Sequence, residues 1–149
     1  MGTLTELFAP ERIAVIGATA REGSIGRAVT ANLLAEYDGQ IVPVNPNYEE
    51  VLGLACVDDV GEADADMAVI VVPPKIALPA VEQAGEAGVN NVVVITAGFG
   101  ETGGDGASRE KELKGIAADY DMNLVGPNSL GIMSTANGMN ASFGPDSPE

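Results

Sequence analysis

A glycine-rich segment near the start of the chain has the residue types of a phosphate-binding loop. The apolar run Ile-Ala-Val-Ile-Gly, residues 13–17, leads into "ATAREGSIG", so that glycine stands at Gly17, Gly23 and Gly26. Glycine allows a backbone to turn sharply and to approach a ligand closely. The first turn of a helix that follows such a loop favours anions. The segment therefore predicts a loop that holds an anionic group.

The spacing of these glycines differs from that of two common nucleotide-binding loops. In the dinucleotide fingerprint, the first two glycines lie two positions apart, whereas Gly17 and Gly23 are six apart here. That fingerprint is also followed by a carboxylate after the second strand, and this chain has Asn45-Pro46-Asn47 there. A Walker loop requires Lys after its last glycine, but "GSI" follows here. A nucleotide held by its phosphates, without the carboxylate, remains as the ligand.

The few cationic side chains of the chain support an anionic ligand. Only seven residues are Lys or Arg, yet Arg21 and Arg27 flank the glycine loop and Lys75 follows a later apolar run. We expect all three to lie at or near the same edge of the fold. Arg12, in contrast, precedes the first apolar run and belongs at the opposite edge.

Alternating apolar runs and helical stretches would position these residues. Uninterrupted Val- and Ile-rich runs predict strands buried on both faces of a parallel sheet, and they cover residues 12–17, 39–46, 66–74 and 90–98. Residues 122–126 predict a fifth strand. Apolar residues at helical spacing predict helices over residues 25–37, 75–88 and 107–120. This alternation predicts an α/β fold with a doubly wound, mostly parallel sheet. Ligands of such sheets bind outside the carboxyl ends of the strands, on the loops that follow them.

Several finer expectations follow from the same pattern. Ile25 and Ile76 belong to the apolar positions of the first two helical patterns, and Pro79 is expected to limit the first turns of the second helix. In the third pattern, Leu113, Ile116 and Ala117 are expected to face inward. Residues 48–54, "YEEVLGL", predict a short helix. The tail from Asn137 turns to Gly, Pro and Ser and predicts an edge strand followed by an exit from the domain.

Composition limits the class of protein. A chain of 149 residues with 46% hydrophobic content predicts one domain, residues 1–149, with no internal linker. The net charge of −15 argues against nucleic acid and against anionic membranes as partners. The apolar runs are too short to span a bilayer, the start lacks the pattern of a signal peptide, and Cys56 stands alone. These features favour a cytoplasmic protein without a disulfide framework or a metal cluster.

The acidic residues are spread along the chain rather than gathered in a tail. Stretches such as "YEE", "CVDDVGEADAD" and "GETGGDGASRE" carry them in several places. This pattern predicts a solvated acidic surface of the halophilic type, because high salt screens the repulsion between its charges.

Five motifs in order and register carry a resemblance to a known family. They are "VIGATAREGSIGRAV", "PVNPNYEEVLGL", "AVIVVPP", "VVVITAGFGETG" and "GPNSLGI". Together they resemble the N-terminal CoA-binding domain of the ADP-forming (NDP-forming) acyl-CoA synthetases, which is related to the α subunit of succinyl-CoA synthetase. The likeness runs from Phe8 to about Phe143. It implies a Rossmann-like domain that binds CoA or acyl-CoA, with an acetyl-CoA-like product.

The loop pattern and the resemblance together give the candidate ligand-binding residues, with no catalytic residue and no metal ligand among them. They are Gly17, Thr19, Arg21, Gly23, Ser24, Ile25, Gly26 and Arg27 after the first strand, Val44, Asn45, Pro46 and Asn47 after the second, Val72, Pro73, Pro74 and Lys75 after the third, Ile95, Thr96, Ala97 and Gly98 after the fourth, and Asn128 after the fifth.

Two positions depart from the family pattern. The family often has Lys where Asn47 stands, which shifts the expected phosphate contact to Arg21 or Lys75. The fifth motif usually has Cys where Ser129 stands, a nearly isosteric change.

The family reaction passes through an acyl phosphate and a phosphohistidine, and it needs an ATP-grasp region. This chain has no histidine. We therefore expect it to be inactive alone and to be part of a longer acid–thiol ligase, with the remaining domains or subunits as partners. A free-standing CoA-binding regulatory module and an NAD(P)-binding domain are the alternatives.

Overall fold

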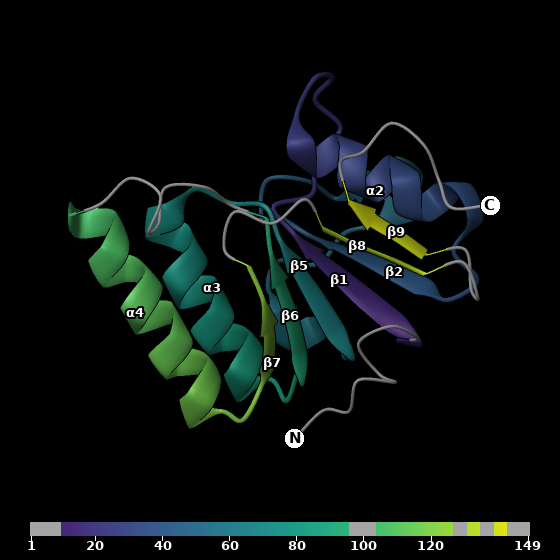
Figure 1. Cartoon of the computed structure of the whole chain (residues 1–149). Coiled ribbons are helices and arrows are strands. Elements are labelled where there is room, and N and C mark those ends of the chain that lie inside the picture. The colour runs from purple at the N-terminus through teal and green to yellow at the C-terminus, as the bar shows by residue number, and fades with distance from the viewer. Residues whose placement is uncertain (1–9, 96–103, 127–130, 135–138, 143–149) are drawn as a thin grey trace.

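A parallel sheet of five strands forms the centre of the molecule. The computed structural model describes residues 10–95, 104–126, 131–134 and 139–142. Its strands follow the spatial order β2-β1-β5-β6-β7 (Figure 1). They span Arg12–Ile16 (β1), Gln40–Val44 (β2), Met67–Ile70 (β5), Asn91–Val94 (β6) and Asn123–Val125 (β7). Each of the five lies within a predicted strand, so the predicted α/β class is confirmed.

Helices cover both faces of this sheet. Helix α2, Ile25–Glu36, lies on one face, and helices α3, Pro74–Glu86, and α4, Gly104–Asp119, lie side by side on the other (Figure 1). Strand β1 pairs with β2 on one side and with β5 on the other. The chain therefore winds outward in two directions from β1 and β5. In such a sheet, the carboxyl ends of these two strands form the switch point where ligands bind.

Successive residues of the central strands belong to two different cores. Ile13 and Val15 of β1 pack in the cluster that contains Val29 and Leu33 of α2. Ala14 and Ile16, which point the other way, belong to the cluster that includes Leu113 of α4 and residues of α3. Because both faces are covered, the strands carry no polar face, which explains their uninterrupted apolar sequence.

At the amino edge of the sheet, the side chains of Asp66 and Tyr37 bind the backbone around the start of β1. The Asp66 carboxylate accepts hydrogen bonds from the backbone N–H groups of Glu11 at 2.7 Å and Arg12 at 3.2 Å. The buried Tyr37, just after α2, donates its hydroxyl proton to the carbonyl of Pro10. Burial first, and then the negative charges of Asp66 and Glu11, raise the pKa of Tyr37 to about 12.

The prediction of a short helix over residues 48–54 is wrong. The segment forms a hairpin of two short antiparallel strands, β3 (Glu50–Val51) and β4 (Leu54–Ala55). The residues between them, Leu52 and Gly53, have φ values of 51° and 84°. Positive φ at both positions of a two-residue loop is typical of the tight hairpin turn that matches strand twist. Glycine at the second position supplied a turn signal that the apolar spacing concealed.

Two apolar residues of the helical patterns lie outside the core. Ile25, the first residue of α2, is 47% exposed, and Ile76 in the first turn of α3 is 54% exposed. Both lie at the carboxyl edge of the sheet, where the helices begin beyond the strands and the core ends. Helix α3 continues through Pro79, which does not limit it.

The tail does not add an edge strand to the central sheet. Strands β8, Gly131–Ser134, and β9, Met139–Ser142, pair with each other in an antiparallel hairpin, and β9 lies against α2 (Figure 1). The predicted exit after β9 lies outside the described residues. Within the described part of the chain, no helix is long and apolar enough to cross a membrane.

Candidate functional site

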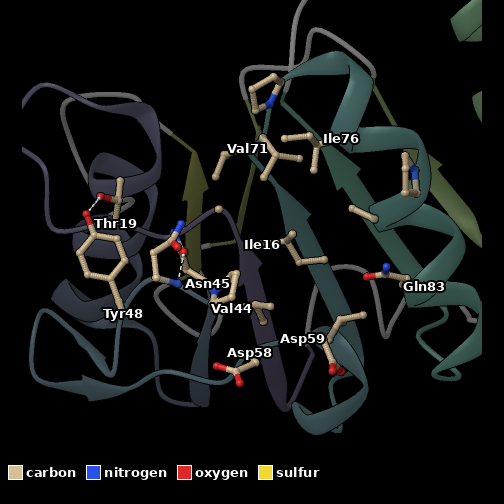
Figure 2. A pocket seen from close by; sticks show the side chains of 18 of the residues that line it. Ile16, Thr19, Val44, Asn45, Tyr48, Asp58, Asp59, Val71, Ile76 and Gln83 are labelled. Atoms are coloured by element: carbon tan, nitrogen blue, oxygen red, sulfur yellow. Dashed lines mark hydrogen bonds between the residues drawn. The ribbon is translucent and has the colours of Figure 1, made fainter.

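A cleft of about 580 Å³ opens at the switch point of the sheet (Figure 2). Its walls come from the loops after β1, β2 and β5, from α3, and from the segment that leads into the short 3₁₀ helix η1, Val60–Glu62. Small-molecule sites commonly have volumes of about 300–1,000 Å³. The cleft therefore has room for a ligand of nucleotide size.

The cleft lining combines polar and apolar side chains. Thr19, Asn45 and Tyr48 lie together on one side, whereas Val71, Ile76 and Gln83 lie on the other (Figure 2). The cleft therefore offers a ligand both hydrogen-bonding groups and apolar surface.

Three glycines shape the loop after β1, each for its own reason. Gly23 has φ +80°, a conformation that glycine adopts without a steric cost, and a Cβ added there would have no atom within 4 Å. Gly17 has φ +96°, and a Cβ there would lie 2.8 Å from Val72 Cγ1. A Cβ on Gly26 would lie 2.5 Å from the carbonyl oxygen of Gly17. Gly26 thus lets α2 pack directly against the end of β1.

Hydrogen bonds within the loop engage two of the predicted ligand-binding side chains. Ser24 caps α2: its hydroxyl accepts from the N–H of Arg27 at 3.2 Å and donates to the carbonyl of Arg21 at 2.7 Å. The Arg27 guanidinium donates to the carbonyl of Ala20 at 2.7 Å. Both side chains therefore stabilise the loop itself.

The loop after β2 is tied to the glycine loop. Asn45 Nδ2 donates to the carbonyl of Ala18 at 2.9 Å, and Asn45 Oδ1 accepts from the N–H of Asn47 at 2.9 Å. The hydroxyls of Tyr48 and Thr19 share a hydrogen bond with 2.8 Å between their oxygens (Figure 2). The two loops therefore form one continuous wall of the cleft.

Many of the predicted site residues line the cleft. They are Gly17, Thr19, Arg21, Val44, Asn45, Pro46, Asn47, Val72 and Pro73. The cleft lining does not include Gly23, Ser24, Ile25, Gly26, Arg27, Lys75 or Ile95. Thr96, Ala97, Gly98 and Asn128, and the side chain of Pro74, lie outside the part of the chain that the structure describes.

Tertiary structure adds lining residues that sequence reasoning missed, Tyr48, Asp58 and Ile76 among them. Tyr48 follows Asn47 directly and could have been found from the loop after β2. Asp58 comes from a later segment, which Val57 attaches to the end of β2 through a bridge to Val44. No carboxylate follows β2 directly, as predicted, but Asp58 reaches the same region from further along the chain.

The cleft has few positive charges. Among the described residues that line it, Arg21 is the cation, while Asp58 and Asp59 are carboxylates. Asp59 is engaged in capping η1, where its Oδ1 accepts from the N–H of Gly61 at 2.8 Å. Within the described ranges, no group of three or more His, Cys, Asp or Glu residues could hold a metal ion.

Cys56 lies beside the loop after β2, which forms part of the cleft wall. Its thiol donates to the carbonyl of Asn45 at 3.4 Å. Burial raises the pKa of the Cys56 thiol, and the nearby negative charge of Asp58 adds to this. The thiol is therefore held protonated, as a donor to the loop after β2.

Fold and site together define an α/β nucleotide-binding type of domain, with its cleft at the switch point of a doubly wound sheet. The family model described as CoA binding domain matches residues 11–135 of this chain. This chain belongs to that CoA-binding family.

Two similar proteins are ADP-forming acetate–CoA ligases. Acetate–CoA ligase (ADP-forming) I of Archaeoglobus fulgidus is 43% identical over 148 residues, which are 98% of this chain and 22% of that protein. The α subunit of acetate–CoA ligase (ADP-forming) II of Pyrococcus furiosus is 45% identical over 94% of this chain and 31% of that subunit.

A solved structure shares the fold closely. It is the dinucleotide-forming acetyl-coenzyme A synthetase 1 of Ca. Korarchaeum cryptofilum in complex with phosphate and ADP, which matches with a TM-score of 0.91 and 40% identity over 97% of this chain and 32% of that chain. This chain is thus a CoA-binding domain of the kind found in ADP-forming acetyl-CoA synthetases. It spans less than a third of the length of each of these three proteins.

Proposed function

We propose that the cleft binds CoA as the substrate of thioester formation. The observation that carries this proposal is the glycine loop on the wall of a nucleotide-sized cleft at the switch point. Hydrogen bonds from Asn45 and Tyr48 hold this loop in place. The loops after β1, β2 and β5 provide backbone and side-chain contacts, and Arg21 provides the positive charge for a phosphate. Lys75 is the weaker candidate for that phosphate, because the cleft lining does not include it.

An NAD(P) ligand is the second candidate, and Asp58 is the observation that favours it. Dinucleotide sites place a carboxylate near the end of the second strand, where it binds the ribose hydroxyls. Asp58 lies on the cleft wall near the end of β2. The glycine spacing and the family still favour CoA, so the two ligands should be compared directly.

Calorimetric titration of the chain with CoA and with NADH tests the proposal. We expect binding of CoA and weaker or absent binding of NADH. Equal or tighter binding of NADH would contradict the assignment of CoA.

A pair of glycine substitutions locates the site. Gly23 and Gly88 both have positive φ, +80° and +84°, and neither has an atom within 4 Å of a Cβ position. Gly23→Val and Gly88→Val therefore introduce the same backbone strain, one in the glycine loop and one at the far end of α3. We expect Gly23→Val to abolish measurable CoA binding and Gly88→Val to retain it. Equal affinities in the two variants would show that the glycine loop is only a turn.

At the level of the whole enzyme, we propose that this chain is the CoA-binding domain of a longer ADP-forming acid–thiol ligase in the cytoplasm. The proposal rests on the relatives, which are acetate–CoA ligases much longer than this chain. The phosphohistidine and the ATP-grasp region would then belong to other domains or subunits, because this chain has no histidine. We expect no phosphoenzyme when the chain is incubated with labelled ATP. A stable phosphoenzyme in the pure chain would refute the assignment of the phosphorylated residue to other domains or subunits.

A further inference from the structure

One hydrogen bond of the cleft wall reaches from the loop after β2 to the glycine loop by side chains alone. Tyr48 and Thr19 are 29 positions apart in sequence, and their partly buried hydroxyls lie 2.8 Å from each other. Both residues line the cleft (Figure 2). None of the residue roles implied by the family resemblance falls on Tyr48.

A second hydrogen bond connects Thr19 to the backbone of Arg21. Thr19 Oγ1 accepts a hydrogen bond from the N–H of Arg21 at 3.1 Å. On its other side, the carbonyl of Arg21 accepts from the hydroxyl of Ser24 at 2.7 Å. The backbone of Arg21 is therefore held at both its N–H and its carbonyl. The acceptor of the N–H is a threonine hydroxyl that also shares a hydrogen bond with Tyr48.

The two backbone hydrogen bonds of Arg21 matter because the residue lies in an exposed part of the loop. The residue is exposed, and it precedes Gly23, whose positive φ marks a sharp change of chain direction. A long arginine side chain on a loosely held loop loses much conformational freedom when it binds a ligand. A backbone fixed before binding reduces that loss.

We propose that Tyr48 is a positioning residue, which sets Arg21 for a phosphate of the ligand through the hydroxyl of Thr19. The inference rests on the proposed binding of CoA in this cleft. Asn45 does not replace Tyr48 in this role, because its amide holds the loop one residue earlier, at the carbonyl of Ala18. Tyr48 thus acts on the cation that lines the cleft in the described part of the chain, without having to touch the phosphate itself.

The first test compares two Tyr-to-Phe substitutions. Tyr48→Phe keeps the ring and removes the bond to Thr19. Tyr37→Phe is the matched control, because it removes a tyrosine hydroxyl that donates to a backbone carbonyl at the opposite edge of the sheet. Loss of one hydrogen bond of this kind corresponds to about a threefold to tenfold change. We expect CoA affinity to fall by that factor in Tyr48→Phe and to stay unchanged in Tyr37→Phe, when both are measured by calorimetry.

Substitutions at Thr19 test the middle of the chain of bonds. Thr19→Val removes the hydroxyl at nearly constant shape, and Thr19→Ser keeps it. We expect Thr19→Val to weaken CoA binding at least as much as Tyr48→Phe, and Thr19→Ser to retain most of the affinity. Loss of affinity in both Thr19 variants would indicate a packing role for the methyl group and would overturn the inference.

A double-mutant cycle separates positioning from general stability. Arg21→Gln should weaken CoA binding strongly in the wild-type background and much less in the Tyr48→Phe background, because Arg21 is already misplaced there. Amide hydrogen exchange of free protein gives a readout that needs no ligand. We expect the N–H of Arg21 to exchange faster in Tyr48→Phe than in wild type and unchanged in Tyr37→Phe.

The outcomes distinguish this inference from the proposed function. If wild type binds CoA but the effects of Tyr48→Phe and Arg21→Gln add independently, the positioning role is overturned and the CoA site stands. Unchanged affinity in Tyr48→Phe leads to the same conclusion. If wild type does not bind CoA, the proposed function fails, and this inference fails with it.

Discussion

At the scale of single residues, Asp58 places a negative charge on the wall of a cleft whose proposed ligand is a polyanion. Its side chain is exposed and lines the cleft together with Asp59. Of the two, Asp59 has a structural role in capping η1. Asp58 is thus the better position at which to test the electrostatics of the cleft.

We expect Asp58→Asn to tighten CoA binding by about twofold to fivefold at low salt, since like charges a few ångströms apart repel through partly hydrated protein. The gain should shrink toward 1 M KCl as salt screens the charge. Asp64→Asn is the control: it makes the same charge change at the opposite edge of the sheet, and Asn tolerates the positive φ of 50° found there. Weaker binding in Asp58→Asn would instead assign the carboxylate to a ligand hydroxyl or amine.

Tyr37 predicts an alkaline limit of stability. Its pKa is raised to about 12, mainly by burial, from an ordinary value of 10. A raised pKa means that the neutral phenol stabilises the folded state. This contribution is complete below pH 10 and is lost as the pH rises toward 12. We expect the free energy of unfolding to fall over that range in wild type and to fall less in Tyr37→Phe, as measured by denaturant titration at each pH. Parallel pH profiles for the two proteins would contradict this role.

At the scale of secondary-structure elements, the contact between α2 and the end of β1 depends on the absence of a side chain at Gly26. The Thr30 hydroxyl donates to the carbonyl of Gly26 at 2.8 Å, and both residues are buried. A Cβ on Gly26 would lie 2.5 Å from the carbonyl oxygen of Gly17, so helix α2 begins close against the strand end. This contact places its N-terminus beside the glycine loop, where the helix dipole favours an anion.

We expect Gly26→Ala to lower the free energy of unfolding by about 1–3 kcal/mol, because a Cβ would meet the backbone oxygen of Gly17 and one of the two elements would have to move. Gly115→Ala in α4 is the matched control, since a Cβ there has no atom within 4 Å. That change should raise stability by about 0.5–1 kcal/mol through helix propensity. Thermal and denaturant unfolding measure both. Equal effects at the two positions would show that α2 does not pack as closely as described.

At the scale of the whole molecule, the net charge of −15 acts on both folding and binding. None of the carboxylate side chains that the structure describes is buried. The acidic residues therefore repel one another across the surface, and salt relieves this repulsion.

We expect the melting temperature to rise between 0.1 and 1 M KCl, as the Debye length falls from about 10 Å to about 3 Å. CoA affinity should rise as well, because the long-range repulsion of a polyanion outweighs the contact with Arg21. Sucrose in place of KCl is the control, since it favours the compact state without screening charge. A falling melting temperature would show that the acidic surface is not an adaptation to salt. A rising melting temperature with falling affinity would show that the contact with Arg21 affects CoA binding more than the long-range repulsion does.

The sequence by itself determined the elements and the edge at which the ligand site lies. Uninterrupted apolar runs are the consequence of a sheet covered on both faces, so β1, β2, β5 and β6 could be predicted before the fold was known. The glycines of the first loop carry their own conformational signal, and Gly17 and Gly23 do have positive φ. Loops after parallel strands gather at one edge whatever the strand order is, which is why residues as distant as Thr19, Asn45 and Val72 could be assigned to one cleft.

Only the tertiary structure decided which side chains face the cleft and which support its wall. Periodicity alone counts Ile76 among the apolar residues of its helix, whereas the fold shows that the helix begins beyond the strand ends and leaves it exposed. The bridge between Val44 and Val57, which brings Asp58 to the cleft, joins segments with no shared motif. Ser24 and Arg27 have the residue types of ligand contacts, but their hydrogen bonds go to the loop. Periodicity and local spacing report backbone preferences, whereas the partner of each polar group depends on which segments folding brings within about 3 Å of it.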